Sequence, residues 1–228
     1  MEFSSDRETR PNKHQLRSER TRANIMDAAE PLFAPHGLAG VSMRQIAAAA
    51  GVDLPLVAYH FQSKVALYNA VVDRIMLDFT RRRTELMDEL EARNPTPGAV
   101  ELFDMLLTAW FGIVFGPAPH RARLILLGFN LEYHPHGEGE AQWPSDPFVK
   151  RFVAALGRAE PSRTTQDIHW TYHCLTGAIV YFMTSSERVE RISGAYCDVR
   201  SPDAIRAALM QQVRNAFPER PGKIKALA

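Results

Sequence analysis

The fold is decided by residues 42–64, which read SMRQIAAAAGVDLPLVAYHFQSK. Ser42 precedes Gln45 by three positions, a capping-box spacing in which each side chain bonds the backbone N–H of the other residue. A helix therefore starts after Ser42, and Gly51 ends it because glycine tolerates the positive φ of a tight turn. Asp53 then stands where a short second helix needs an N-terminal cap. The stretch predicts two short helices joined by a tight turn.

A longer helix is predicted on each side of this pair. The first starts near Ser18 and ends near Pro35, with a kink or a tightened turn at Pro31 because proline removes a backbone bond. The second starts after a cap at Ser63 and continues until Pro95. Both carry apolar residues at helical spacing, namely Ile25, Ala28, Ala29, Leu32 and Phe33 in the first and Leu67, Val71, Ile75, Phe79, Leu86 and Leu90 in the second.

Helix signals also dominate the rest of the chain, and strand signals are scarce. Apolar helical segments are expected at 96–115 and 121–133, followed by a surface loop rich in Gly, Glu, His and Pro at 134–144. The remaining helices are expected to begin near Asp146, Thr164 and Ser201. The sequence therefore predicts an all-α protein.

Composition limits the class of protein further. The 228 residues are 46% hydrophobic, carry a net charge of +1 and include two cysteines. No run of about 18 uncharged apolar residues could span a membrane, and the first ten residues are charged where a secretory signal would be apolar. We therefore expect a cytoplasmic protein with no membrane partner. A net charge of +1 also excludes binding of nucleic acid by bulk charge alone.

Charge is distributed unevenly, however. Between Arg7 and Arg22 there are six basic and two acidic residues. This segment predicts a flexible basic arm, either merely solvated or in contact with DNA. The two short helices beside it form a helix-turn-helix, whose second helix can lie in the major groove of DNA. Ser42, Tyr59, His60 and Lys64 are suited to donate hydrogen bonds to phosphate oxygens around that groove.

Residues 20 to 70 resemble the TetR family of bacterial regulators. The resemblance rests on Ala28, Ala29, Leu32, Phe33, Gly37, Ser42, Ile46, Ala47, Ala50, Gly51, Val52, Tyr59, His60, Phe61, Ser63, Lys64, Leu67 and Tyr68. It implies an N-terminal three-helix DNA reader, a larger helical domain that binds a small molecule, and a homodimer built mainly from the last long helices. The partners expected are a palindromic double-stranded DNA operator, a small-molecule effector and a second copy of the chain.

The resemblance also implies roles for single residues. Ser42, Tyr59, His60 and Lys64 match positions that hold the DNA backbone, whereas Arg44, Leu54 and Pro55 match positions that face bases. An arginine in the major groove can bind guanine bidentately. Two positions depart from the family pattern, because Ala58 stands where tyrosine is common and Val65 where an acidic residue is usual. With few polar side chains, the recognition helix is expected to read thymine methyls and DNA shape as well.

The chain is accordingly expected to have four parts. They are a flexible basic arm at 1–17, a helix-turn-helix DNA-binding domain at 18–66, a ligand-binding and dimerisation domain at 67–218 and a flexible tail at 219–228. The function expected is a ligand-responsive repressor, released from its operator by a small apolar or aromatic molecule.

Candidate pocket residues are the aromatic side chains of the larger domain. They are Phe103, Trp110, Phe111, Phe115, Phe129, Tyr133 and Trp170. Each could equally belong to an ordinary core, since aromatic stripes at helical spacing usually do. The helix from Thr164 and the helix from Ser201, with Ile205, Leu209, Val213 and Phe217, are the candidate dimer face; packing inside one subunit is the open alternative.

Other functional classes find little support. His134 and His136 lie near Glu138 and Glu140, and His169 and His173 share one helix face, but surface and core histidines explain both sets better than a metal site does. No phosphate loop, nucleophile elbow or paired-cysteine motif is present, so we expect no enzyme, cofactor or metal. The alternative is an all-helical ligand-binding protein or enzyme in which the N-terminal helices are only structural.

Overall fold

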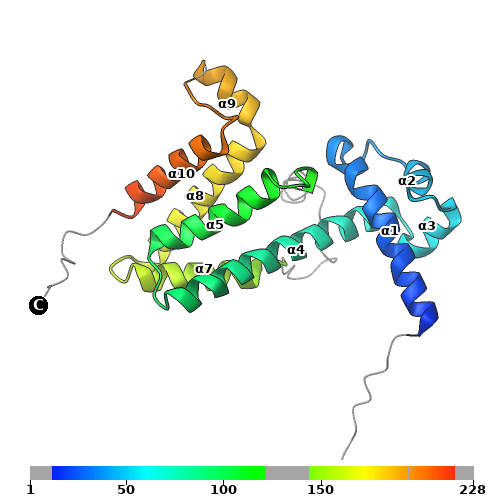
Figure 1. Cartoon of the computed structure of the whole chain (residues 1–228), viewed down its shortest axis with the longest axis horizontal. Helices are drawn as coiled ribbons and strands as arrows, with labels where there is room; N and C mark the ends of the chain where they lie inside the picture. Colours follow the sequence, from blue (N-terminus) through cyan, green and yellow to red (C-terminus); the bar gives the residue numbers. More distant parts are fainter. Residues whose placement is uncertain (1–11, 122–143, 195, 219–228) are drawn as a thin grey trace, which may run out of the picture. The chain divides into compact units, whose positions relative to one another are not determined.

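The computed structural model describes residues 12–121, 144–194 and 196–218, and every regular element within these ranges is an α-helix. The all-α prediction is confirmed. The helices are α1 (Lys13–His36), α2 (Met43–Ala50), α3 (Leu54–Phe61), α4 (Lys64–Arg93), α5 (Ala99–Val114), α7 (Asp146–Ala159), α8 (Thr165–Thr184), α9 (Ser186–Ser193) and α10 (Pro202–Ala216) (Figure 1). None of the described helices could cross a membrane, because none is both long and apolar enough.

The chain divides into two compact units, residues 1–71 and residues 72–228. The boundary falls inside α4, so the first two turns of that helix belong to the first unit. The sequence placed this boundary a few residues earlier, after residue 66. Because α4 is one uninterrupted amphipathic helix, no turn or proline marks the point where its packing partners change.

The start of α1 differs from the prediction. Asn12 caps the helix with a capping box, in which its side chain accepts from the backbone N–H of His14 and its own N–H donates to Gln15 Oε1 at 2.9 Å. The helix therefore begins at Lys13, and the expected flexible arm at 1–17 is wrong for residues 13–17. The part of the arm before residue 12 lies outside the described residues.

The helix-turn-helix follows the sequence signals closely. Ser42 and Gln45 form the predicted capping box, and Gly51 ends α2 in the left-handed region with φ of 65° and ψ of 33°. Asp53 occupies the N-cap position of α3, but its side chain makes no capping bond; its carbonyl accepts from the N–H of Leu56 at 3.0 Å instead.

A small core holds these helices together. It is formed by Ile25, Ala29, Phe33, Ile46, Val57, Phe61, Leu67 and Tyr68, all of which are buried. The Phe33 and Tyr68 rings meet edge to face, with centroids 5.1 Å apart. Asn24 of α1 donates to the carbonyl of Ala50 at 2.8 Å, which fixes α1 to the end of α2. The first unit is thus a three-helix core closed by the start of α4.

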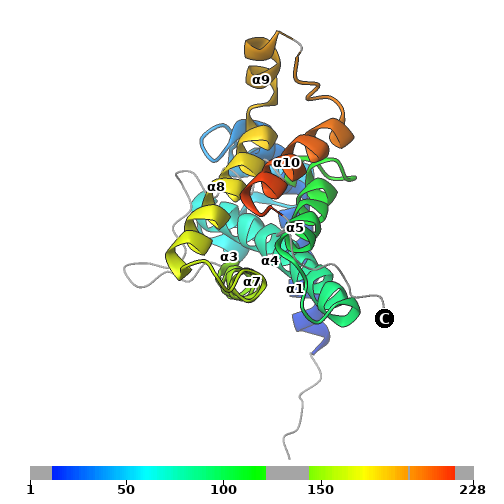
Figure 2. The ribbon, with the colours of Figure 1, turned by 90° about the vertical axis from the view of Figure 1, so that its left-hand side faces the viewer.

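The second unit is a helical bundle with an aromatic centre. In it α5 packs against α7 and α10, and α8 packs against α7 and α10 (Figure 2). Phe103 of α5 meets Phe152 of α7 at 5.4 Å, and Phe152 meets Tyr172 of α8 at 5.6 Å between ring centroids. The segment expected at 121–133 and the loop expected at 134–144 lie almost wholly outside the described residues.

Three helix starts in this unit test the cap predictions. Thr164 and Ser201 cap α8 and α10 through their side chains, as predicted. Ser145 rather than Asp146 occupies the N-cap position of α7. The sequence analysis did not predict α9 as a separate helix. It has eight residues, and none of them is buried.

Candidate functional site

The recognition helix α3 exposes large apolar side chains. Its inner face is formed by Val57 and Phe61, which are buried. Leu54, Leu56 and Tyr59 are 37%, 38% and 76% exposed. A helix of only eight residues that leaves three large side chains in water presents a surface suited to contact another molecule.

The candidate phosphate-binding residues surround this helix within the first unit. Ser42 is exposed at the start of α2, and its hydroxyl is held by Gln45, whose backbone N–H donates to Ser42 Oγ at 3.2 Å. The first-turn N–H groups of a helix have no intrahelical acceptor and attract anions. The Ser42 hydroxyl already bonds with Gln45, so the groups available to donate to a phosphate are the backbone N–H groups at the start of α2.

Tyr59, His60 and Lys64 follow at the end of α3 and the start of α4. The Tyr59 and His60 rings meet edge to face with centroids 5.2 Å apart, and this contact orients the exposed phenol. Ser63 caps α4 by accepting from the N–H of Ala66 at 3.0 Å and so sets the position of Lys64 in the first turn. Within the described parts of the chain, neither the Lys64 ammonium nor the Tyr59 hydroxyl has a hydrogen bond or an ion pair.

The three candidate base-reading residues come from two helices that pack together. Arg44 is exposed in the first turn of α2, and its guanidinium has no partner among the described residues. Leu54 and Pro55 are exposed in the first turn of α3. The exposed Arg44 guanidinium and the apolar first turn of α3 are compatible with the predicted mixture of guanine recognition and contact with thymine methyls.

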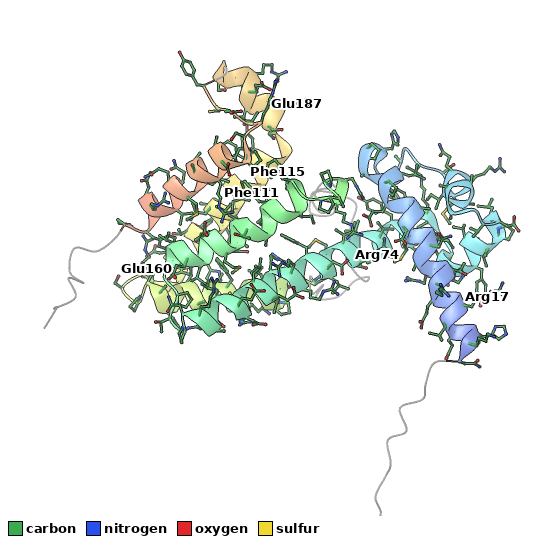
Figure 3. The ribbon with its side chains drawn as sticks, viewed as in Figure 1. Arg17, Arg74, Phe111, Phe115, Glu160 and Glu187 are labelled. Carbon is green, nitrogen blue, oxygen red and sulfur yellow. The ribbon has the colours of Figure 1, made fainter. Side chains whose placement is uncertain are left out.

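Sequence reasoning missed the helical form of the basic N-terminal residues. Lys13, Arg17 and Arg20 are exposed on the first turns of α1, where Figure 3 labels Arg17. The signal that could have revealed the helix is the Asn12 to Gln15 capping box. A helix holds these three charges in fixed positions, as a flexible arm would not.

The candidate pocket residues do not form one group. Phe103 and Trp110 are buried, and Phe111 is half-buried with its ring centroid 5.1 Å from that of Phe115 (Figure 3). Phe115 is 45% exposed, and Trp170 is 65% exposed on α8 rather than in the core. The other two candidates, Phe129 and Tyr133, lie outside the described residues. The pocket as a set remains a prediction.

A buried arginine in the second unit was not foreseen. Arg83 of α4 is 5% exposed, and its guanidinium lies 4.4 Å from the ring centroids of both Phe79 and Phe148. Burial lowers the pKa of Arg83 to about 10, although the nearby Tyr172 phenol opposes part of this shift. Burial also raises the pKa of Tyr172. No sequence signal distinguishes Arg83 from its exposed neighbours Arg81 and Arg82.

The candidate dimer face is corrected in part. Ile205, Leu209, Val213 and Phe217 of α10 are buried inside the chain, so these residues belong to the core of the subunit and not to an exposed face. The outer face of α8 is exposed instead, with Trp170, His173, Cys174, Gly177 and Tyr181 along it. His169 and His173 stack on this helix with ring centroids 6.2 Å apart. The other candidate metal ligands, at 134–140, lie outside the described residues.

Two family models match the chain. Residues 25–71 match the model described as "Bacterial regulatory proteins, tetR family", and residues 119–214 match the model of a "Tetracyclin repressor-like, C-terminal domain". Together they include the helix-turn-helix and most of the second unit.

Known proteins agree with these models. The chain is 32% identical to the HTH-type transcriptional repressor SCO4008 of Streptomyces coelicolor over 116 residues, which cover 46% of this chain and 57% of that protein. The curated relatives are matched over 36% to 57% of their own lengths.

Solved structures share the fold over nearly their whole lengths. SCO4942 of Streptomyces coelicolor superposes with a TM-score of 0.57 at 24% identity, covering 88% of this chain and 99% of the other. The regulator FadR of Bacillus subtilis, solved in complex with stearoyl-CoA, gives a TM-score of 0.55 at 18% identity, covering 82% and 97%.

Proposed function

Since the chain belongs to the TetR family of bacterial regulators, we propose that it is a ligand-responsive repressor that binds a palindromic DNA operator as a homodimer. In this proposal α3 enters the major groove, and the backbone N–H groups that follow Ser42 at the start of α2 bind the flanking phosphates together with Tyr59, His60 and Lys64. Arg44, Leu54 and Pro55 contact base edges. A small molecule bound in the second unit releases the protein from DNA.

The single observation that carries the proposal is the exposed face of α3. Three large side chains, Leu54, Leu56 and Tyr59, stay in water although the same helix buries Val57 completely. Arg44 and Lys64, which have no partner among the described residues, accompany them in the first unit. An exposed apolar helix face beside two cations and a helix N-terminus is complementary to the major groove of DNA, which is flanked by phosphates and exposes the methyl groups of thymine. A purely structural role for these helices would leave both the exposure and the charges unexplained.

The homodimer is proposed on the exposed face of α8. Trp170 and Tyr181 are 65% and 45% exposed, with exposed Gly177 between them, where the absence of a side chain permits close approach of a second helix. The neighbouring α10 exposes small and polar residues on the side opposite its buried stripe, namely Ala204, Ala208, Gln211 and Gln212. Exposed aromatic side chains are enriched at the interfaces between subunits.

Release by an effector follows from differential binding. A ligand dissociates the complex only if it binds the DNA-incompetent dimer more tightly than the DNA-competent one. The structural neighbour FadR of Bacillus subtilis was solved in complex with stearoyl-CoA, which supports an effector with an apolar body here. The second unit here, with its buried aromatic centre, is the place proposed for the effector.

Selection from a random double-stranded DNA library tests the proposal directly. The full-length protein should enrich sequences that contain two inverted half-sites, because a symmetric dimer presents two α3 helices related by a two-fold axis. Leu54→Asp should abolish enrichment, since it places a negative charge at the groove. Leu77→Asp is the matched control, because Leu77 is 57% exposed on α4 in the second unit. No enriched sequence, or equal loss with both variants, would contradict the proposal.

A further inference from the structure

Two histidines share the outer face of α8. His169 and His173 lie four positions apart on this helix, and both are exposed. Side chains with this spacing are neighbours on one face of an α-helix. Their imidazole rings lie nearly parallel, with an angle of 24° between the ring planes and 6.2 Å between the ring centroids. The helix thus exposes two imidazoles side by side.

These imidazoles have no hydrogen-bonding task among the described residues. Neither ring has a hydrogen bond or an ion pair there, and the ring contacts of His173 are with His169 and Tyr172. A neutral imidazole has one ring nitrogen that carries a free lone pair. The pair therefore has two nitrogen lone pairs available to one ligand that accepts electrons from both.

The spacing of the rings suits a metal ion bound by both nitrogens. Zinc bonds an imidazole nitrogen at about 2.0–2.1 Å, and two such bonds at the tetrahedral angle place the ring centroids about 5 Å apart. The observed centroids are 6.2 Å apart, and both side chains are exposed, so small rotations of their torsions can close the difference. Two histidines at positions i and i+4 of one helix are also the zinc ligands of helical metal motifs.

The composition of the pair restricts the ion. Among the described residues, no group of three or more His, Cys, Asp and Glu side chains could hold a metal ion. An ion bound by this pair would therefore keep open positions for water or for a ligand from outside the subunit. Imidazole suits zinc, nickel and copper ions, whereas Mg²⁺ and Ca²⁺ prefer oxygen ligands.

We propose that His169 and His173 chelate a divalent transition-metal ion of the zinc, nickel and copper class on the outer face of α8. The sequence alone favoured ordinary surface or core histidines, but the parallel, exposed and otherwise unbonded rings favour chelation. The inference goes beyond the proposed function and does not depend on it, because both ligands belong to one helix of one subunit. His169 precedes Gly177 by about two helical turns, so the ion would lie beside the closest approach proposed for the dimer.

Calorimetric titration of the untagged full-length protein with Ni²⁺ tests the inference. The wild type should have a Ni²⁺ site that His169→Asn and His173→Asn each weaken by about tenfold or more, because a single imidazole cannot chelate. An excess of Mg²⁺ should not displace Ni²⁺ from this site. Absence of the site in the wild type, equal affinity in both variants, or displacement by Mg²⁺ would overturn the proposal.

His36→Asn is the matched control for the loss of one histidine. His36 is exposed in the last turn of α1, in the first unit, and no histidine lies three or four positions from it. The Ni²⁺ affinity of this variant should equal that of the wild type. A loss as large as that in His169→Asn would show that the ion does not depend on the α8 pair, which refutes the inference.

Restoring the spacing at a new position separates chelation from a structural role of either histidine. Thr165 is exposed at the start of α8, four positions before His169. His173→Asn combined with Thr165→His keeps two histidines four positions apart and should recover Ni²⁺ affinity by about tenfold over His173→Asn alone. His169→Asn combined with Thr165→His spaces the two histidines eight positions apart and should recover none. Recovery in both double variants, or in neither, would refute chelation by the pair.

Discussion

Arg44 and Lys64 carry the same charge in the first unit, and the proposed function gives them different roles, a base contact for Arg44 and a phosphate contact for Lys64. Arg44 is exposed in the first turn of α2, whereas Lys64 begins α4 beyond the end of α3. A phosphate contact holds every DNA sequence equally, while a contact to a base edge distinguishes sequences. The two roles can therefore be separated by measuring binding to more than one sequence.

Substituting each cation by alanine should separate these roles. Arg44→Ala is expected to cost about 1–3 kcal/mol on the selected operator and to relax the preference at one base position of each half-site. Lys64→Ala should weaken binding to all sequences about equally. Fluorescence anisotropy with the operator and with single-base variants measures both effects. Arg81→Ala, exposed in the second unit, serves as the control; equal losses for Arg44→Ala and Lys64→Ala on every sequence would refute the assignment.

The basic residues at the start of α1 give a second prediction at this scale. Arg17 and Arg20 are exposed and lie on a helix, so their charges have defined positions. If they contact phosphates, Arg17→Ala and Arg20→Ala should each make the salt dependence of DNA binding shallower by about one unit of slope. An unchanged slope in both variants would show that this end of α1 is merely solvated. Anisotropy titrations at several salt concentrations measure it.

Among the elements, helix ends were predicted better than helix partners. The caps at Ser42, Ser63, Thr164 and Ser201 are as expected because capping depends on a few adjacent residues. By contrast, the apolar stripe of α10 from Ile205 to Phe217 could from sequence belong either to a dimer face or to the core of one subunit, and the structure buries it in the chain. Periodicity identifies the apolar face of a helix, but not whether its own chain or a second copy covers it.

The candidate site shows the same difference. The candidate DNA-contacting residues of the first unit could be placed from sequence because the turn and the caps fix where α2 and α3 expose them. Arg83 could not be identified, since it stands in a run of three arginines and only the packing of Phe79 and Phe148 buries it. Trp170 was a candidate for an apolar ligand pocket, with an ordinary core as the alternative, yet it lies exposed on α8.

The turn between α2 and α3 gives a prediction at the scale of the element. Gly51 has φ of 65°, a conformation that costs a residue with a Cβ about 1–2 kcal/mol. Gly51→Ala should therefore lower the free energy of unfolding by about that amount, although no atom lies within 4 Å of the new Cβ. Gly157→Ala, inside α7 with equally open space, should raise it by about 0.5–1 kcal/mol. Urea titration measures both changes, and two changes of the same sign would contradict the strain argument.

At the scale of the whole molecule, the proposed dimer links the face of α8 to DNA binding. A single α3 helix makes few contacts with DNA. When a dimer binds two half-sites, the second α3 adds its contacts without a second loss of translational freedom. Disrupting the dimer should therefore weaken operator binding although no DNA-contacting residue has changed.

Trp170→Glu combined with Tyr181→Glu should give a monomer in analytical ultracentrifugation, because two buried charges would face each other across the two-fold axis. The affinity of this monomeric variant for the operator should be lower than that of the wild type. The control is Leu77→Glu, an exposed apolar residue on α4, which should leave the dimer intact. A doubly substituted protein that remains dimeric would show that α8 does not form the interface.

The central claim, that the first unit binds DNA through α2, α3 and the start of α4, is tested most directly by the salt dependence of wild-type affinity. Anisotropy of a labelled operator duplex is measured from low to high salt. We expect the logarithm of the association constant to fall linearly with the logarithm of the salt concentration, by about 0.9 for each phosphate neutralised. Affinity that stays constant as salt rises, or the absence of binding at low salt, would contradict the account.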